Sequence, residues 1–404
     1  MTLSYTAIKK ALAGHRLPAA FVDLDAFDAN AARVRQLIVG RGTPLRVASK
    51  SVRVPDLLRR LLDGSEGQFV GLMCFATEEA AFLAGLGFDD LLVAYPAIQD
   101  GDLSLAARLT AEGTAIRLVA DSREGIDRIA AAGRAAGVAI DVVLCVDMSL
   151  ELVAGRVHLG VRRSPLHRVD DVVRLARYVA ERDGARFFGI MGYEAQVAGL
   201  GDDNPFEPLL NPIKSLIRSA SARELGPRRR RMVDELTGQG LAPTLVNGGG
   251  SGSLDSTTPA TGVTEVTAGS AFFKPHLFDY FRSAHMQALE PACFFALEAT
   301  RRPAPNIVTC LGGGYVASGP PSRDKVPLPW RPAGAALLDE EMCGEVQTPV
   351  VLTDPTEVAL GDPIVFRHAK GGELAERFHE LLLLRSGEVV GRAKTYRGEG
   401  QCFF

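Results

Sequence analysis

The sequence predicts an α/β protein, with an N-terminal (β/α)8 barrel of the TIM type and a C-terminal all-β domain. Short apolar runs alternate with amphipathic helical segments over roughly 250 residues, which matches a closed barrel in strand count and length. No reversal point in this alternation favours the alternative architecture, a doubly wound open sheet. After about Pro291 the pattern changes to short β-rich runs separated by turn residues, which indicates a second domain.

The expected barrel strands are short β-branched or apolar runs, each followed by turn and helix signals. They are Leu45–Lys50, Gln68–Cys74, Asp90–Ala94, Ala115–Ala120, Asp141–Asp147, Phe187–Tyr193, Thr244–Asn247 and Gly262–Thr267. Helices are expected between them, such as Thr77–Leu86, Gly101–Glu112, Ser122–Ala136, Val169–Arg182 and Ile213–Gln239. The basic run Arg228–Arg231 lies in the last of these, where nearby acidic residues indicate a solvated helix face.

The two ends of the chain are expected to form one β-domain. Its C-terminal strands are expected at Ala292–Ala299, Asn306–Leu311, Val346–Leu352, Asp362–Arg367, His379–Leu384 and Glu388–Thr395. The strand Ala19–Leu24 precedes the first barrel strand, and we expect it to join them. The predicted boundaries are therefore residues 1–25 for an N-terminal segment joining the β-domain, 26–288 for the barrel and 289–404 for the C-terminal β-domain.

Composition excludes several classes of function. The chain has 404 residues, 47% of them hydrophobic, and a formal net charge of −3, so electrostatics favour neither nucleic acid nor an anionic membrane as a partner. The six cysteines are scattered without a Cys-x-x-Cys spacing, which suits reduced thiols better than disulfides or a zinc knuckle. No apolar run is long enough for a signal peptide or a membrane span. We therefore expect a soluble cytoplasmic protein.

Lys50 is the first candidate for chemistry, because it ends the first barrel strand. Catalytic residues of such barrels gather at the C-terminal ends of the strands, a rule that also selects Asp147, Tyr193, Asn247 and Thr267. An unpaired ammonium is costly to bury, and a desolvated lysine is suited to forming a Schiff base. The alternative interpretation is a lysine at a strand end that only reaches solvent.

A glycine-rich motif, Val246–Ser253, has its glycines directly after the seventh expected strand. Consecutive glycines let backbone N–H groups converge on one point, and the loops after strands 7 and 8 are where barrels most often bind phosphate. The alternative is a flexible turn; a Walker loop is excluded because no Gly-Lys-Ser/Thr follows. A lysine after strand 1 and a phosphate cradle after strand 7 together predict pyridoxal 5′-phosphate (PLP), an aldehyde that carries a phosphate.

With these features the chain resembles the fold-type III PLP enzymes, the alanine-racemase-like group, and within it the D-threonine aldolase and D-serine dehydratase branch. The matching residues are Phe21–Asp25 with Asn30, Lys50, Val146–Asp147, Gly160–Val161, Gly192–Glu194, Gly248–Gly252, Glu265, Gly269–Ser270, Gly361–Asp362, His368 and Arg397–Gly398. No single motif decides the matter, but their order and spacing are fairly specific.

The resemblance implies roles for particular residues. Lys50 would carry PLP and act as acid and base at Cα, and Tyr193 would face the cofactor or substrate unless it is only a rim aromatic. Asn247 and the loop residues Gly249, Gly250 and Ser251 would bind the cofactor and its phosphate.

Two positions depart from the family pattern. Where the family has an arginine that meets the pyridine nitrogen, this chain has His158, with Arg162 nearby. The usual His-x-Cys or His-x-Asp metal pair reads His368–Ala369–Lys370, and a charged lysine does not bind a divalent ion. We expect His368 to lie beside the substrate as a catalytic residue and to bind a divalent metal weakly with Glu373; the alternatives are His379 as the second ligand, or no metal at all.

The resemblance therefore implies a PLP-dependent lyase acting on a small β-hydroxy-D-amino acid, by aldol cleavage or by dehydration with deamination. The alternatives are a PLP-dependent amino-acid racemase and, in another class, a non-catalytic PLP-binding protein. A homodimer is implied as well, with the β-domain of each chain over the other chain's barrel.

Overall fold

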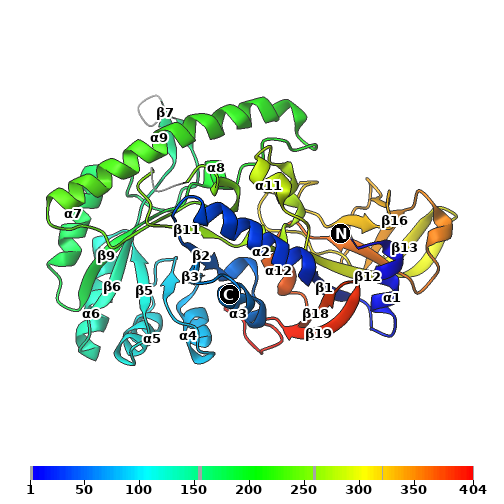
Figure 1. Cartoon of the computed structure of the whole chain (residues 1–404), viewed down its shortest axis with the longest axis horizontal. Helices are drawn as coiled ribbons and strands as arrows, with labels where there is room; N and C mark the ends of the chain where they lie inside the picture. Colours follow the sequence, from blue (N-terminus) through cyan, green and yellow to red (C-terminus); the bar gives the residue numbers. More distant parts are fainter. Residues whose placement is uncertain (1–2, 153–156, 258–260, 321, 404) are drawn as a thin grey trace.

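The N-terminal part of the chain is a closed parallel barrel (Figure 1). The structure is a computed structural model that describes residues 3–152, 157–257, 261–320 and 322–403. All eight expected strands take part in the barrel in chain order, which confirms the closed barrel over the open sheet. They are β2 (Leu45–Ala48), β3 (Phe69–Cys74), β4 (Leu91–Val93), β5 (Ile116–Ala120), β6 (Ile140–Cys145), β9 (Ala185–Gly192), β10 (Leu245–Gly248) and β11 (Glu265–Ala268).

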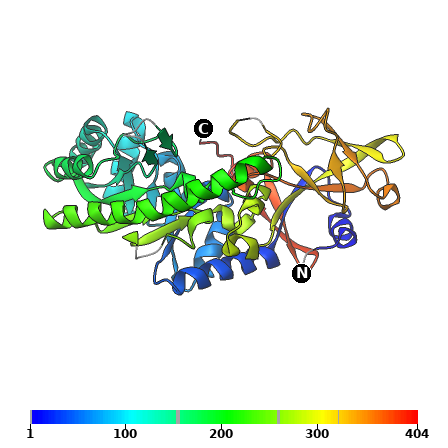
Figure 2. The ribbon, with the colours of Figure 1, turned by 90° about the horizontal axis from the view of Figure 1, so that it is seen from above.

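Helices cover the outside of the barrel. They are α2 (Leu24–Val39), α3 (Pro55–Asp63), α4 (Thr77–Gly85), α5 (Asp100–Ala111), α6 (Arg123–Ala136), α7 (Val169–Ala180) and α9 (Asn211–Gly238). Shorter helices follow β9 and β11 in the chain: α8 (Ala195–Ala198), α10 (Ser270–Phe273) and α11 (Ala284–Ala288). The long helix α9 runs along the barrel toward the β-domain (Figure 2). Among the described residues, no helix is both long and apolar enough to cross a membrane.

The basic run on α9 differs in part from the expected solvated face. Arg230 and Arg231 are exposed, but Arg228 and Arg229 are buried, at 6% and 2% exposure. Arg229 forms an ion pair with Glu194, and Arg228 lies 2.9 Å from Glu224. These pairs offset part of the cost of removing the two guanidinium groups from water.

The barrel interior is layered, because alternate residues of each strand point inward. A lower layer is polar: Arg46 on β2 is held by Glu265 on β11 at 2.7 Å and by Asp90 at 3.1 Å. An apolar layer lies in the same interior and consists of Leu92, Val119, Val143, Met191 and Leu245. These packed layers close the barrel centre, so a ligand has room only at the C-terminal ends of the strands.

Among the described residues, nine further strands form a second sheet that contains both ends of the chain, apart from a separate short pair, β7 (Leu150–Leu152) and β8 (Val157–Leu159). Strand β1 (Ala19–Asp23) pairs antiparallel with β12 and parallel with β18, so the N-terminal strand does join the C-terminal ones. The other strands are β12 (Cys293–Ala304), β13 (Ile307–Leu311), β14 (Leu328–Arg331), β15 (Ala336–Leu337), β16 (Gln347–Val351), β17 (Pro363–Arg367), β18 (Glu380–Arg385) and β19 (Glu388–Lys394). The helices α1 (Tyr5–Leu12) and α12 (Gly371–Ala375) accompany this sheet.

Candidate active site

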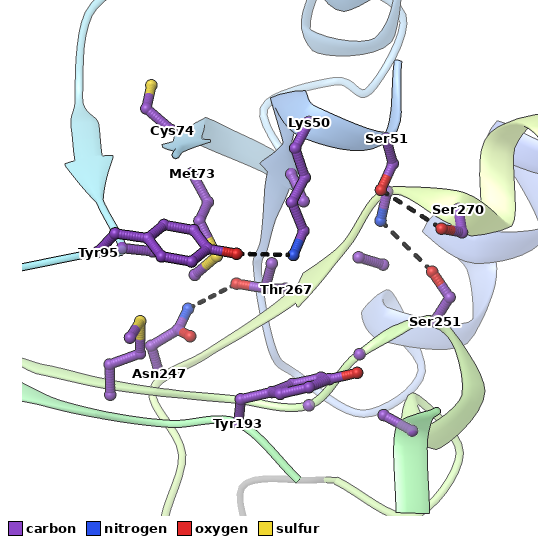
Figure 3. A pocket seen from close by; sticks show the side chains of 18 of the residues that line it. Lys50, Ser51, Met73, Cys74, Tyr95, Tyr193, Asn247, Ser251, Thr267 and Ser270 are labelled. Atoms are coloured by element: carbon purple, nitrogen blue, oxygen red, sulfur yellow. Dashed lines mark hydrogen bonds between the residues drawn. The ribbon is translucent and has the colours of Figure 1, made fainter. Parts of the chain in front are cut away.

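Lys50 enters a pocket at the mouth of the barrel. It follows β2 directly, in the short 3-10 helix η1 (Ser49–Ser51), and its Nζ donates a hydrogen bond to the Tyr95 hydroxyl at 3.2 Å (Figure 3). The pocket is open to solvent and lies at the C-terminal ends of the barrel strands, where such barrels bind small molecules. The expected burial of Lys50 is wrong for this structure: its side chain is exposed, because it extends into the open pocket and not into the core.

The glycine-rich loop forms another wall of this pocket. Gly249 has φ +82°, a conformation that favours glycine, and a Cβ on Gly250 would lie only 2.6 Å from the Cβ of Ala198. The Ser251 hydroxyl accepts hydrogen bonds from the backbone N–H groups of Ala271 at 3.0 Å and Gly269 at 3.4 Å. The loops after β10 and β11 are therefore joined into one narrow cradle, as a phosphate site requires.

Asn247 is fixed at the base of the pocket by the polar layer below it. Its Nδ2 donates to Glu265 Oε1 and to Thr267 Oγ1, both at 2.8 Å. Glu265 in turn accepts from Arg46 Nε at 2.7 Å. A buried amide with two partners holds one orientation, so Asn247 presents a fixed polar surface to a ligand.

Tyr193 lies across the pocket from Lys50 (Figure 3). In the open pocket 37% of its surface is exposed, yet protein atoms surround much of the ring. This burial raises the pKa of the Tyr193 hydroxyl, and the guanidinium of Arg163, 5.5 Å from the ring centroid, opposes the shift only in part. Tyr193 therefore keeps its proton at neutral pH and is suited to donate a hydrogen bond.

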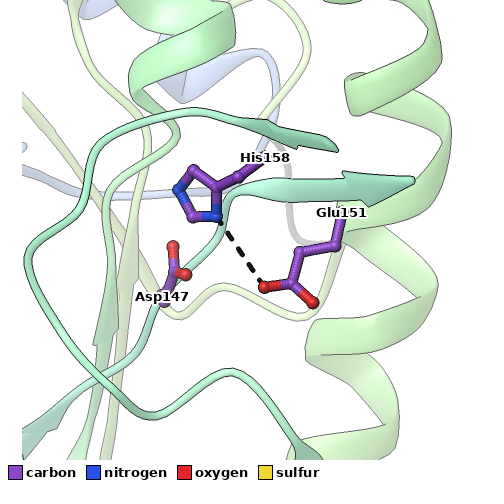
Figure 4. Close-up of side chains that lie close together, drawn as sticks. All are labelled: Asp147, Glu151 and His158. Atoms are coloured by element: carbon purple, nitrogen blue, oxygen red, sulfur yellow. Dashed lines mark ion pairs between the residues drawn. The ribbon is translucent and has the colours of Figure 1, made fainter. Parts of the chain in front are cut away.

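The residues expected at the pyridine nitrogen lie elsewhere. Over the described residues, the pocket lining includes Arg163 but neither His158 nor Arg162. His158 instead turns toward Asp147 and Glu151 (Figure 4), and Arg162 is exposed. This corrects the assignment of His158 and Arg162 as cofactor ligands.

The expected metal pair does not fit a metal ion. His368 is buried, and its Nδ1 lies 2.8 Å from the backbone nitrogen of Lys370, while its Nε2 lies 2.6 Å from the backbone oxygen of Tyr315. Glu373 accepts from the Ser318 hydroxyl at 2.6 Å and pairs with Lys370 Nζ at 3.1 Å. Because both ring nitrogens of His368 face backbone groups, the metal assignment to His368 and Glu373 is wrong for this geometry.

His368 does not meet the expectation of a catalytic residue either. It lines neither the pocket nor the wider cavity above it, as far as the described residues show. Burial lowers the pKa of its imidazole, which favours the neutral ring that links the backbone of Lys370 to that of Tyr315. Its geometry is that of a residue that shapes the loop carrying Lys370.

Above the pocket, a wider cavity extends to loops of the β-domain. Most cations around it have an acidic partner: Lys214 pairs with Glu207 at 2.5 Å, and Lys325 with Asp324 at 3.0 Å. Within the described ranges, Arg163 has no acidic partner within ion-pair distance. It is therefore a candidate to bind an anionic ligand group.

Several residues that line the pocket were not predicted from the sequence. Tyr95 follows β4, so the rule that selected Lys50 from the end of β2 should have found it too. Ser51 and Ser270 lie next to predicted site residues, and their hydroxyl oxygens are 3.3 Å apart. Arg163 lies in a loop without a strand pattern, and the sequence carries no signal for it.

Comparisons with known proteins agree with this fold. Residues 22–276 match the family described as "Alanine racemase, N-terminal domain". The chain is 25% identical over 256 residues to 3-hydroxy-D-aspartate aldolase of Paracoccus denitrificans, an alignment that covers 63% of this chain and 60% of that relative.

Solved structures give the same result for the fold. D-threonine aldolase from Filomicrobium marinum superposes with a TM-score of 0.78 at 22% identity, covering 95% of this chain and 96% of that one. For D-threo-3-hydroxyaspartate dehydratase from Delftia sp. HT23 the TM-score is 0.75 at 18% identity, covering 95% and 98%. At these identities the similarity establishes the shared fold.

Proposed function

We propose, since the chain belongs to the alanine racemase N-terminal domain family, that it is a PLP-dependent lyase acting on a small β-hydroxy-D-amino acid. One observation carries the proposal: the Lys50 amine lies in the same pocket as two joined glycine-containing loops. An amine that can bind an aldehyde and a cradle that can bind a phosphate are the two fixed points that PLP needs. The names of the relatives support the substrate class.

The residues present fit PLP. Lys50 would bind the aldehyde carbon of PLP, and the backbone from Gly249 to Ser251 would hold its phosphate. This backbone conformation needs a glycine at position 250, because a Cβ there would collide with Ala198. Ser251 keeps the two loops together, and Asn247 would meet the ring or its substituents from below. When bound, PLP supplies an electron sink that stabilises negative charge at the substrate's Cα.

The chain's own residues would then position the substrate and move protons. Tyr95 holds the amine of Lys50 at 3.2 Å, so that Lys50 is oriented to take or return the proton at Cα. Arg163, a cation without an acidic partner among the described residues, would bind a substrate carboxylate. The protonated hydroxyl of Tyr193 would donate to an oxygen on the opposite side of the substrate.

Product analysis tests the proposal and separates the two lyase reactions. The PLP-loaded protein is incubated with D-threonine, with D-3-hydroxyaspartate and with the corresponding L-amino acids. Aldol cleavage yields glycine and an aldehyde, whereas dehydration with deamination yields a 2-oxo acid and ammonium. Either pair of products from the D-substrates supports the proposal. The absence of both pairs, with PLP bound in full, contradicts it and favours a non-catalytic PLP-binding protein.

A racemase is the second candidate, and one observation favours it. Racemisation needs an acid or base on each face of Cα, and Lys50 and Tyr193 lie on opposite sides of the pocket (Figure 3). Exchange of the α-proton with deuterated solvent, accompanied by inversion and without loss of the β-substituent, would support this function over a lyase.

A homodimer also remains part of the proposal, and sedimentation velocity at micromolar concentration tests it.

A further inference from the structure

A group of potential metal ligands lies outside the pocket. Asp147 follows β6, and Glu151 and His158 face each other in the short antiparallel pair of β7 (Leu150–Leu152) and β8 (Val157–Leu159). One ligand atom from each residue lies within 4.8 Å of the other two (Figure 4). The pocket lining, over the described residues, contains none of the three, so this group is separate from the site of the proposed function.

The orientation of His158 shows which of its nitrogens faces the carboxylates. Its side chain is only 7% exposed, and its Nε2 lies 3.3 Å from the backbone oxygen of Val161. A carbonyl oxygen can only accept, so Nε2 carries the proton, and in a neutral ring Nδ1 then has a free lone pair. That lone pair is directed toward Ser149 Oγ at 3.3 Å and Glu151 Oε1 at 3.7 Å.

The surroundings of this nitrogen consist of acceptors. The single proton of the Ser149 hydroxyl is directed to Asp147 Oδ2 at 2.8 Å, so it is not shared with His158. Asp147 also accepts from the Ser149 backbone N–H at 2.8 Å, and Glu151 reaches solvent. A cation between them would stabilise an imidazole lone pair and two carboxylates that converge in this way. A proton on His158 is one such cation, and a metal ion is the other.

We propose that Asp147, Glu151 and His158 bind a divalent transition-metal ion of the zinc class. Nitrogen and carboxylate oxygen are ligands that zinc accepts, and a tetrahedral site with bonds of about 2.0–2.1 Å places neighbouring ligand atoms about 3.3 Å apart. The observed 3.7 Å between His158 Nδ1 and Glu151 Oε1 needs only a small contraction. A hydrogen bond from the other ring nitrogen to a backbone carbonyl, as to Val161, is the usual support of a metal-binding histidine.

A fourth ligand is within reach. His167 Nδ1 lies 3.8 Å from Glu151 Oε2, and its Nε2 lies 3.2 Å from the backbone oxygen of Ser149, so its free lone pair also faces the carboxylate. The neighbouring cation, Arg228, donates to backbone oxygens and is paired with Glu224 at 2.9 Å. Glu224 offsets part of the charge of Arg228, and the rest acts on Asp147 and Glu151 alongside the proposed ion. The ion would tie the end of β6 to the β7–β8 pair.

Zinc binding tests this inference. The PLP-loaded protein is freed of metal with a chelator and titrated with zinc by calorimetry, and its zinc content is measured after dialysis. We compare wild type with Glu151→Gln and His158→Gln. The matched control is Glu373→Gln, because Glu373 was expected to bind a metal with His368 but does not fit that role in the structure. Wild type and Glu373→Gln should bind one zinc ion per chain with affinities within about twofold. Glu151→Gln should bind at least about tenfold more weakly, because loss of even an outer-shell partner costs roughly 10–100-fold.

Thermal unfolding provides the second readout. Zinc should raise the Tm of wild type and of Glu373→Gln but not that of Glu151→Gln. Glu151 is an exposed residue, so its isosteric replacement should keep the fold and the PLP content even if His158→Gln does not fold. Three results would overturn the inference: wild type that binds no stoichiometric zinc, Glu151→Gln that binds zinc as wild type does, or Glu373→Gln that loses it.

Discussion

Lys50 lies in the pocket because of the alternation along β2 and the turn that follows. Arg46 contributes to the polar layer inside the barrel, Ala48 lines the pocket and Lys50 extends into it, whereas Val47 packs outward against the helices. Ser49 is buried beside Lys50, and its hydroxyl donates to the backbone oxygen of Met73 at 2.9 Å. This bond anchors the turn, so the exposed amine starts from a fixed backbone.

Replacement of this lysine should abolish covalent attachment of PLP. In Lys50→Ala the pocket keeps its glycine loops but has no amine to bind the aldehyde. The purified variant should lack the visible absorbance of the wild type and should incorporate no label upon borohydride reduction. Lys370→Ala is the matched control, since Lys370 lines the wider cavity and its Nζ donates to the backbone of Ser318 at 2.8 Å. A labelled peptide without Lys50 would contradict the assignment.

Arg163 should determine how tightly a carboxylate-bearing substrate binds. Replacing Arg163 with methionine removes a charge-assisted hydrogen bond worth about 1.5–3 kcal/mol, which corresponds to an increase in KM of roughly 10–160-fold. With saturating PLP, kcat should change much less than KM, and Arg163→Lys should recover part of the loss. Arg162→Met is the matched control because Arg162 is exposed and lies outside the pocket lining. Equal KM values for Arg163→Met and wild type would contradict this role.

The residues that sequence reasoning placed well are those fixed by regular backbone. Lys50 and Asn247 follow from the positions of β2 and β10, and Gly250 follows from the loop directly after β10. His158 lies in the short β7–β8 pair and His368 in an irregular turn after β17. There the direction of each side chain depends on a hydrogen bond to one backbone oxygen, that of Val161 or of Tyr315. The hydrogen bond between His368 and Tyr315 joins residues 53 positions apart, so no local sequence pattern predicts it.

At the scale of elements, the barrel was predictable because its strands are buried on both sides and bounded by glycines. Every expected barrel strand is present, with end points that differ by at most three residues, as for Gly262–Thr267 and the observed β11 (Glu265–Ala268). The strands that were missed are short and have too few alternations to form a pattern: β7 and β8 have three residues each, β14 has four and β15 has two.

The glycine loop gives the prediction that belongs to this scale. In Gly250→Asp the new side chain would approach Ala198 and Tyr193 and place a carboxylate near the phosphate of PLP. At roughly 5 Å and an effective dielectric constant of about 20, the repulsion is about 3 kcal/mol per unit charge, or more than a hundredfold in Kd. Equilibrium dialysis measures the Kd for PLP. Gly101→Asp on α5 is the control, since nothing lies within 4 Å of a Cβ there. Similar PLP affinities in the two variants would argue against this cradle.

At the scale of the whole molecule, the chain passes from the β-domain sheet into the barrel and back again. Polar side chains join the β-domain to the barrel. Strand β1 lies between β12 and β18 before the chain enters the barrel. Arg53, just after the lysine turn, pairs with Glu376 at 2.7 Å, near the loop of the wider cavity. Tyr396, which follows β19, donates from its hydroxyl to Glu79 on α4 at 2.8 Å. These contacts fix the β-domain against the mouth of the barrel.

Glu79 makes this junction sensitive to pH. Its side chain is fully buried, and burial raises its pKa from 4.5 to about 7, although the Phe75 N–H and the Tyr396 hydroxyl donate to it. Because the folded-state pKa lies above the unfolded value, the folded state holds this proton more tightly. The resulting stabilisation is complete below pH 4.5 and is lost as pH rises to about 7. The pKa difference sets an upper limit of about 3 kcal/mol for this loss.

Glu79→Gln cannot ionise, so it should remove this pH dependence. Its amide oxygen can accept from the Phe75 N–H, and its amide N–H can donate to the oxygen of the Tyr396 hydroxyl. The free energy of unfolding, measured by urea at several values between pH 5 and pH 8, should fall with rising pH more steeply in wild type than in Glu79→Gln. The free energy of unfolding of Glu79→Gln should therefore increase relative to that of wild type near pH 8, where the wild-type carboxylate is charged and buried. Glu78→Gln removes the exposed neighbouring carboxylate on the same helix and should keep the wild-type slope. Parallel curves for wild type and Glu79→Gln would show that the buried carboxyl does not titrate in this range.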